Sequence, residues 1–242
     1  MSEVVTQLIA EELVPGGRRL GRHIEHDPAS RAFAFGSEEV TLRSVRHERK
    51  IPVLDQGFLG SCTGNAAVGA LGTEPLFSSL PEDRQAGLNE TEAVALYAAA
   101  TRADRVPGSY PPNDTGSSGL GVCKAARAAG FISAYRWTFS LGGLLRALQS
   151  TPVLIGINWY SSFDAPAGDG RIVISDTAYV RGGHELCLDE VDAETKQVAG
   201  FNSWGTTWGD GGRFRMSFDT LQRLLAERGD SKIFVPVLEL RA

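Results

Sequence analysis

The 242-residue chain contains only three cysteines, Cys62, Cys123 and Cys187, and only four histidines. An odd number of cysteines cannot all pair within one chain, and these three are too far apart to match a zinc-binding motif. We therefore expect free thiols and neither a metal nor another cofactor. Free thiols are typical of a reducing compartment, so the cytoplasm is the expected location.

The chain also lacks an excess of positive charge and any long apolar run. Its net charge is −5, which gives no basic face for a nucleic acid. No apolar stretch approaches the ~18 residues that span a bilayer, and no signal peptide is evident. We expect no nucleic-acid and no membrane partner. Only four of the 24 basic residues are lysine, and such arginine-rich composition favours a bacterial or phage source.

Three kinds of segment follow one another along the chain. An amphipathic stretch and a polar stretch make up residues 1–38, which we expect to be a separate N-terminal extension. Apolar residues at helical spacing then predict helices from Ser61, over 89–103 with Asn89 as cap, over 122–129, and over 140–149 with Ser140 as cap. Runs rich in β-branched and aromatic residues predict strands at 152–160, 170–180, 184–191, 197–202 and 212–218.

The order of these elements indicates the fold class. Helices come first and an antiparallel sheet second, which predicts an α+β fold with two lobes over residues 39–242. The helical lobe is expected over about 55–135 and the β lobe over about 136–242. A cleft between two such lobes is the natural place for a functional site.

Cys62 stands where a glycine-bearing loop gives way to the first predicted helix. The unpaired N–H groups and the dipole of a helix N-terminus stabilise a thiolate, the reactive form of cysteine. A nucleophilic cysteine needs a base, and His184, which opens a predicted strand, can face the helical lobe. Asn202 follows at a distance that one hairpin spans, so it could orient the imidazole. The alternative interpretation is that Cys62 is a buried structural thiol.

These residues also stand in a recognisable pattern. Gln56 precedes Cys62 by six residues, and Asn202 begins Asn-Ser-Trp-Gly, which Trp208-Gly209 follows. In this pattern, and in the spacing from Cys62 to Asn202, the chain resembles the papain-like cysteine peptidases over residues 39–242. The resemblance implies the two-lobed papain-like fold of a bacterial or phage member and an enzyme that hydrolyses peptide bonds.

The resemblance also implies a role for each residue. Cys62 would be the nucleophile and His184 its partner, with the pair largely thiolate and imidazolium at neutral pH. Asn202 would orient the imidazole under the cover of Trp204, and Gln56 would donate a hydrogen bond to the oxyanion. Three residues are expected to bind the substrate: Ser117, Gly183 and Trp204.

Two positions depart from the family pattern. Leu59 stands where many members have a disulfide-bonded cysteine, and the loop 113–119 offers no cysteine as its partner. Thr63 stands where an aromatic residue is common. The missing bridge agrees with a reducing compartment.

Other chemically active residues are expected to be structural. Cys123 lies in an alanine-rich helix and Cys187 on the opposite strand face from His184, so both should lie in the core. His23 and His26 lack a third metal ligand and are expected at the surface. A cluster of acidic residues follows His184: Glu185, Asp189, Glu190 and Asp192. It lacks the spacing of a calcium-binding loop, so we expect it to form a solvated strand end and turn.

Two alternative functions accompany the peptidase hypothesis. The same residues could act as a cysteine amidase on peptidoglycan peptides, although the chain shows no cell-wall-binding repeat. A non-catalytic binding or assembly module is the other alternative, although such relatives usually lose Cys62 or His184. Residues 1–38 are too few for the long helical prosegment of secreted relatives. We therefore expect the full-length chain to act without trimming.

Overall fold

A computed structural model describes residues 4–14, 17–35 and 41–237. The α-helices are α1 (Cys62–Leu71), α2 (Glu82–Ala86), α3 (Glu90–Ala103), α4 (Gly119–Ala128), α5 (Leu141–Leu148) and α6 (Phe218–Ala226). Three short 3₁₀ helices are η1 (Pro28–Phe33), η2 (Phe77–Ser79) and η3 (Ser161–Phe163). The strands are β1 (Val5–Gln7), β2 (Arg22–His26), β3 (Val45–Arg46), β4 (Ser117–Ser118), β5 (Ala134–Thr138), β6 (Val153–Tyr160), β7 (Val180–Asp192), β8 (Gln197–Phe201), β9 (Arg213–Ser217) and β10 (Asp230–Val235).

The helical lobe consists of α1 to α4, and its centre is α1, in which every residue is buried. A Cβ at Gly64 would collide with the Ala93 carbonyl of α3, so glycine permits the two helices to approach closely. Asn89 caps α3 by accepting hydrogen bonds from the backbone N–H groups of Thr91 and Glu92, as predicted. The start of α4 lies three residues earlier than predicted, because the Ser118 side chain caps it.

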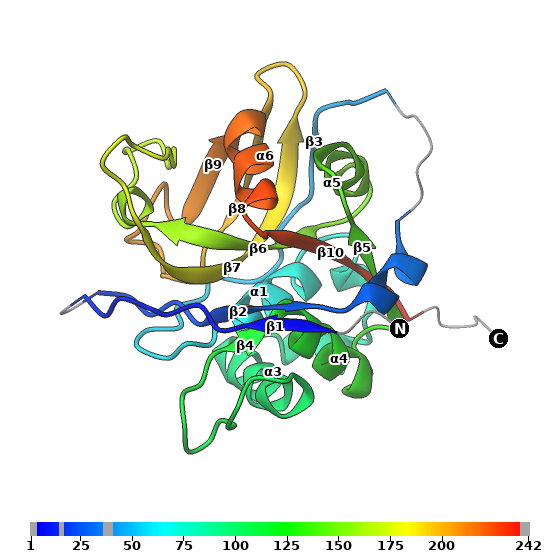
Figure 1. The fold of residues 1–242 in the computed structure, drawn as a ribbon. Coiled ribbons are helices and arrows are strands. Elements are labelled where there is room, and N and C mark those ends of the chain that lie inside the picture. Colours follow the sequence, from blue (N-terminus) through cyan, green and yellow to red (C-terminus); the bar gives the residue numbers. More distant parts are fainter. Residues whose placement is uncertain (1–3, 15–16, 36–40, 238–242) are drawn as a thin grey trace.

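The β lobe is a sheet in the order β5-β10-β6-β7-β8-β9, with β3 beside β7 and with α5 and α6 packed against it. All of its strand pairs are antiparallel. An aromatic cluster of Trp159, Phe163, Trp208 and Phe214 fills the core of this lobe. The predicted α+β architecture, with a helical lobe and an antiparallel β lobe, is therefore present (Figure 1).

The strand predicted over 170–180 is wrong, since only Val180 belongs to a strand there. Arg171 makes a single bridge to Arg215, and Ile172 is buried in the aromatic core while Val173 is exposed. The β-branched residues of this loop therefore anchor it to the core without extended strand pairing. None of the described helices is long and apolar enough to cross a bilayer.

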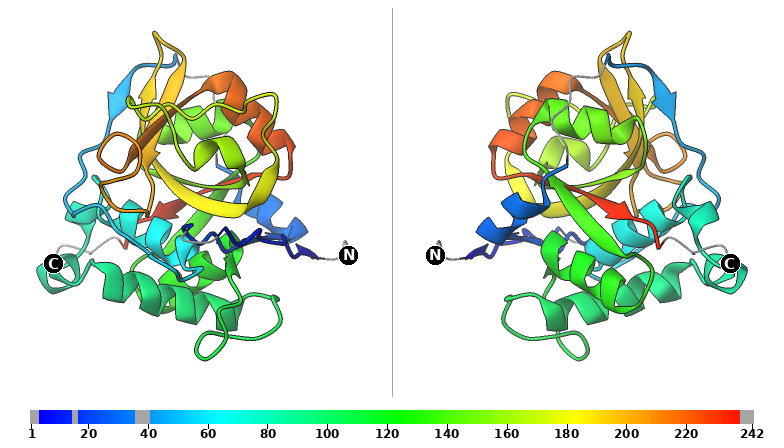
Figure 2. Two further views of the ribbon diagram at one scale, coloured as in Figure 1. Left: turned by 90° about the vertical axis from the view of Figure 1, so that its left-hand side faces the viewer. Right: turned by 90° about the vertical axis from the view of Figure 1, so that its right-hand side faces the viewer.

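The N-terminal segment, by which we mean the described residues 4–14 and 17–35, is not a separate unit. Its strands β1 and β2 form a small sheet with β4 of the helical lobe, in which β2 and β4 run parallel. The segment passes between the helical lobe and the β lobe (Figures 1 and 2). The predicted boundary at residue 38 lies outside the described residues.

Candidate active site

Cys62 is the first residue of α1 and is completely buried. The loop before it makes a close turn with glycines at 57 and 60, and Ser61 precedes the helix. The backbone N–H of Glu185 lies within hydrogen-bonding reach of the thiol. The Cys62 sulfur therefore lies against β7 at Glu185, the residue that follows His184.

The His184 imidazole is held by Asn202, as the sequence predicted. Its Nε2 donates to Asn202 Oδ1 over 2.7 Å, and the same oxygen accepts the Ser203 backbone N–H at 2.8 Å. Asn202 is itself fixed by its backbone N–H, which donates to the Gly212 carbonyl at 3.0 Å. A proton on Nε2 leaves the lone pair on Nδ1, which is buried and has no hydrogen-bond partner among the described residues. In this closed arrangement that nitrogen makes no hydrogen bond to the Cys62 thiol.

Two tryptophans enclose the imidazole. The Trp204 ring lies 5.3 Å from the His184 ring, centroid to centroid, and the Trp159 ring lies 4.7 Å from it with its edge presented. Trp204 therefore covers the histidine as expected. Trp159 was not assigned a role from the sequence, although its position on β6 opposite Gly182 places it beside His184 on the neighbouring strand.

The side-chain amide of Gln56 makes hydrogen bonds within the protein through both its oxygen and its nitrogen. Its Oε1 accepts from Ser203 Oγ at 2.6 Å, which orients the side chain. Its Nε2 donates to the carbonyl of Leu59 at 2.8 Å and lies 3.1 Å from the Arg19 carbonyl and 3.3 Å from the Leu20 carbonyl. The N-terminal segment thus presents its backbone oxygens to the amide that is expected to bind an oxyanion.

The segment also occupies the backbone groups predicted to bind substrate. The Gly21 N–H donates to the Gly183 carbonyl of the β lobe at 3.2 Å, and the Gly21 carbonyl accepts from the Ser117 N–H of the helical lobe at 2.8 Å. A Cβ at Gly21 would collide with the Gly60 backbone, so only glycine fits between the segment and the Cys62 loop. Ser117 and Gly183 therefore bind the chain itself.

Further contacts hold the segment in place. Glu11 accepts the Leu20 N–H at 2.8 Å and pairs with Arg19, while the Arg19 guanidinium lies 3.0 Å from an Asp114 carboxylate oxygen. Trp204 Nε1 donates to the Arg19 carbonyl at 3.2 Å. In this structure the segment therefore covers the site of the full-length chain, and the expected activity without trimming stays a prediction.

Burial in this closed arrangement disfavours the expected ion pair of thiolate and imidazolium, which stays a prediction. Burial raises the pKa of the Cys62 thiol, and the nearby Glu185 carboxylate raises it further. Burial lowers the pKa of His184 to about 4, against the opposing effect of its hydrogen bond to Asn202. The segment removes both groups from water, which disfavours their charged forms. The closed arrangement therefore favours the neutral thiol and the neutral imidazole over their charged forms.

Arg22 of the same segment enters a buried cluster of charges. Its Nη2 lies 2.5 Å from Asp230 Oδ2, and Asp230 also pairs with Lys232. The Lys232 ammonium lies 2.6 Å from Glu185 Oε1. All four side chains are at least nine-tenths buried. We call these four residues, Arg22, Glu185, Asp230 and Lys232, the buried charge cluster.

The buried charge cluster corrects the prediction for the acidic residues of β7. Glu185 and Asp189 are buried rather than solvated, because each has a basic partner: Lys232 for the first and Arg213, at 2.8 Å, for the second. Asp192 accepts from turn N–H groups, as predicted for a strand end. Partners distant in sequence decided which carboxylates became buried.

Four other residues were expected to be structural. Cys123 and Cys187 are buried in the apolar core of the helical lobe, as predicted. His23 is half-buried, with its two ring nitrogens engaged by the Ile9 N–H and the Thr115 carbonyl, so its predicted surface location is wrong. His26 is also half-buried.

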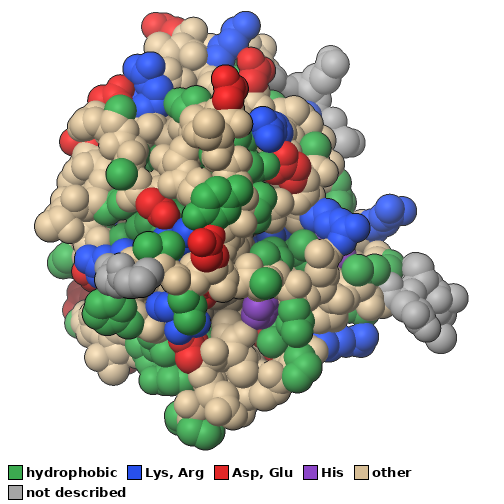
Figure 3. Space-filling model, turned by 60° about the vertical axis from the view of Figure 1, so that its left-hand side comes forward, with side chains coloured by type: hydrophobic (Ala, Val, Ile, Leu, Met, Phe, Trp, Pro, Cys, Tyr) green, Lys and Arg blue, Asp and Glu red, His purple; other side chains and the backbone are tan. Residues whose placement is uncertain are grey.

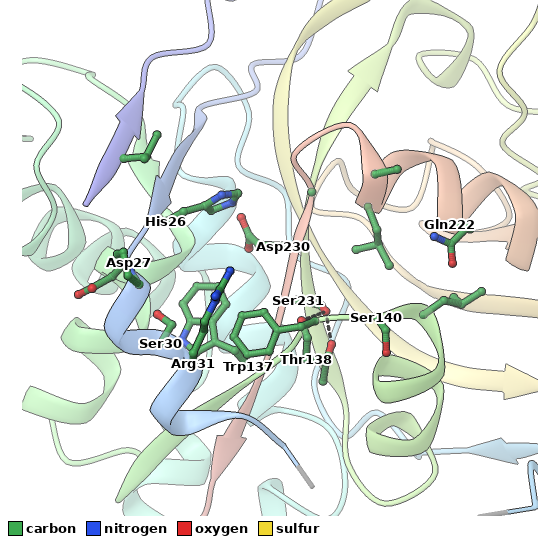
Figure 4. A pocket seen from close by; sticks show the side chains of 17 residues that line it. His26, Asp27, Ser30, Arg31, Trp137, Thr138, Ser140, Gln222, Asp230 and Ser231 are labelled. Carbon is green, nitrogen blue, oxygen red and sulfur yellow. Dashed lines mark hydrogen bonds between the residues drawn. The ribbon is translucent and has the colours of Figure 1, made fainter. Parts of the chain in front are cut away.

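A cavity of about 590 Å³ lies beyond β2, away from Cys62. His26, Arg31, Trp137 and Asp230 are among its lining residues, and Figure 4 shows Asp230 beside His26 at its inner end. The cavity therefore reaches the far side of the buried charge cluster.

The exposed surface gives no sign of a charged partner on the face that Figure 3 shows. Basic and acidic side chains are interspersed there with hydrophobic ones, without an extended patch of either sign among the described residues.

No protein-family model and no curated protein matches the chain. Solved structures do match it. Xylellain, a cysteine protease from Xylella fastidiosa, has a TM-score of 0.73 and 19% identity, over 90% of this chain and 96% of its own. Digestive procathepsin L 3 of Tenebrio molitor has a TM-score of 0.60 and 16% identity, over 85% of this chain and 73% of its own. A Carica candamarcensis cysteine protease has a TM-score of 0.51 and 16% identity, over 78% of this chain and 94% of its own. The chain has the papain-like fold.

Proposed function

We propose that this protein is a cysteine peptidase that hydrolyses peptide bonds, with Cys62 as nucleophile and His184 as its base. The observation that carries the proposal is the 2.7 Å hydrogen bond from His184 Nε2 to Asn202 Oδ1, which leaves Nδ1 free beside the N-terminus of α1. A buried structural thiol would need neither an oriented imidazole nor the amide of Gln56 nearby.

The residues divide the chemistry as follows. Cys62 transfers its proton to His184 Nδ1, and its sulfur attacks the substrate carbonyl carbon. The oxyanion receives hydrogen bonds from Gln56 Nε2 and the Cys62 backbone N–H at the helix N-terminus. The imidazolium, held by Asn202, then protonates the leaving amine. Water, deprotonated by the same imidazole, hydrolyses the thioester and frees Cys62.

The N-terminal segment keeps this enzyme closed in our proposal. Support comes from Gly21, which bonds to both lobes, and from Arg19 and Leu20, whose carbonyls lie against Gln56. Two of the similar structures are named as proforms, a procathepsin and a ragweed pollen cysteine protease. Activity therefore requires residues 18–26 to leave the site.

A peptide-library digest tests the proposal on full-length protein. The wild-type chain, an Arg22→Ala variant that weakens the docking of the segment, and the same variant with Cys62→Ala are incubated with the library and read by mass spectrometry. We expect cleavage by Arg22→Ala, little by wild type and none once Cys62 is replaced. If Arg22→Ala exposes a thiol that iodoacetamide alkylates at Cys62 and yet cleaves no peptide, the protein is not a peptidase.

A further inference from the structure

The side chain of Arg22 enters the protein immediately beside the candidate active site. Gly21, the residue before it, bonds to the backbones of Gly183 and Ser117, and the carbonyl of Leu20 lies against Gln56. The segment therefore crosses the site in an extended form, and Arg22 is the first side chain beyond that crossing to point inward. It is completely buried.

The space that receives Arg22 is open because residue 156 is glycine. A Cβ at Gly156 of β6 would collide with Arg22 Nε and would also approach the carboxylates of Glu185 and Asp230. Glycine at this position opens the sheet to the arginine side chain. Arg22 Nη2 reaches the Arg228 carbonyl at 3.1 Å as well as Asp230.

The charges of the pocket are unbalanced without Arg22. Asp230 and Glu185 supply two carboxylates, whereas Lys232 is the only other basic side chain of the buried charge cluster. Glu185 Oε2 has no hydrogen-bond partner among the described residues. When the segment leaves, two carboxylates face a single ammonium, and this excess of acidic groups favours a cation.

We infer that this pocket recognises an arginine side chain of the substrate, and that Arg22 occupies it in place of substrate. The inference rests on the proposed peptidase function. A substrate that uses the backbone groups of Gly183 and Ser117, as Gly21 does, brings a neighbouring side chain to Asp230 and Glu185.

The first test measures the pocket without relying on catalysis. Full-length Arg22→Ala lacks the atoms of an ethylguanidinium ion, so we measure its thermal unfolding with ethylguanidinium and with the neutral isostere ethylurea. We expect ethylguanidinium to raise the unfolding midpoint of Arg22→Ala in a saturable way, while ethylurea does not and the wild type gains nothing from either. Equal effects of the two compounds on Arg22→Ala would overturn the inference.

The second test measures substrate choice. Full-length Arg22→Ala is given matched peptides that carry arginine or citrulline at one position at a time. At one position we expect kcat/KM to favour arginine on the order of 30-fold, which is typical of losing one partner of a buried charge pair. Adding Asp230→Asn should bring that ratio close to one. Arg22→Lys, which keeps a cation in the pocket, should remain closed and serves as the control.

The two tests separate this inference from the function on which it rests. Cleavage of both peptides at equal rates at every position overturns arginine recognition and leaves the peptidase intact. Absence of any cleavage together with selective stabilisation by ethylguanidinium overturns the peptidase function and upholds the cation site.

Discussion

Two buried sites contact the same N-terminal segment, but the segment has opposite effects on their charges. At Cys62 and His184 it excludes water, which raises the pKa of the thiol and lowers the pKa of the imidazole. At Asp230 and Glu185 it excludes water and inserts Arg22, so the carboxylate of Asp230 is ionised and its pKa lies below the usual range. The difference shows how one segment can disfavour charge at Cys62 and His184 and still dock stably, because it balances the charge of the second site.

The largest effect should come from removing the nucleophile once the segment is loosened. In the full-length Arg22→Ala chain, Cys62→Ala should lower kcat by a factor on the order of 10⁶, as for other enzymes that lose the nucleophile. Cys123→Ala, which empties a small volume in the helical core, is the matched control and should retain activity. Peptide hydrolysis followed by mass spectrometry gives both rates. Residual activity in Cys62→Ala would assign the chemistry to another group.

Removing the Arg22 guanidinium from the buried charge cluster should destabilise the whole protein. Arg22→Met keeps much of the side-chain volume but leaves Asp230 without its guanidinium, so the free energy of unfolding should fall by about 3–5 kcal/mol. The control is Arg18→Ala, which breaks a solvent-exposed pair with Asp55 and should change the free energy by less than about 1 kcal/mol. Urea denaturation measures both. Equal losses in the two variants would mean that the buried charge cluster does not anchor the segment.

Gln56 contacts the segment and is also expected to bind the oxyanion. In the Arg22→Ala background, Gln56→Ala should lower kcat by about 10²–10³-fold through loss of one hydrogen-bond donor. Ser203→Ala removes only the hydroxyl that orients Gln56 and should have a smaller effect. An unchanged rate in a folded Gln56→Ala protein would exclude this residue from the mechanism.

The neutral His184 should make the closed protein less stable in acid. Its pKa is about 4 when folded and near 6.5 when unfolded, so between these pH values only the unfolded chain binds the proton. The free energy of unfolding should therefore fall as the pH is lowered from about 6.5 to 4, by up to about 3 kcal/mol. His184→Gln lacks this contribution, so the difference between its urea titration and that of the wild type isolates it. Parallel pH profiles would contradict a neutral buried imidazole.

Local sequence signals predicted the caps of α3 and α5 and the position of Asn202 beside His184, since each depends on neighbours or on a compact motif. Asn89 and Ser140 cap helices within their own first turns. Asn202 lies beside His184 because one short hairpin connects β7 and β8. Such relations are visible along the chain.

The docking of the N-terminal segment was not predictable in this way. The residues of β2 are mostly polar, and a polar strand with two histidines and an arginine is expected at the exposed surface. Arg22 is buried because it pairs with Asp230, which lies more than 200 residues further along the chain. Glu25 is buried because Ser118, the residue that caps α4, donates a hydrogen bond to it at 2.7 Å. The same reason explains why the sequence did not predict the burial of Glu185: its partner, Lys232, is distant in sequence.

Alkylation of Cys62 tests most directly whether the segment closes the site. Full-length wild type and Arg22→Ala are treated briefly with iodoacetamide at neutral pH, and the modified residues are mapped by tryptic digestion. The account predicts that wild type remains unlabelled, whereas Arg22→Ala is labelled at Cys62 and neither Cys123 nor Cys187 reacts in either protein. Equally rapid labelling of Cys62 in the two proteins would contradict closure by the N-terminal segment.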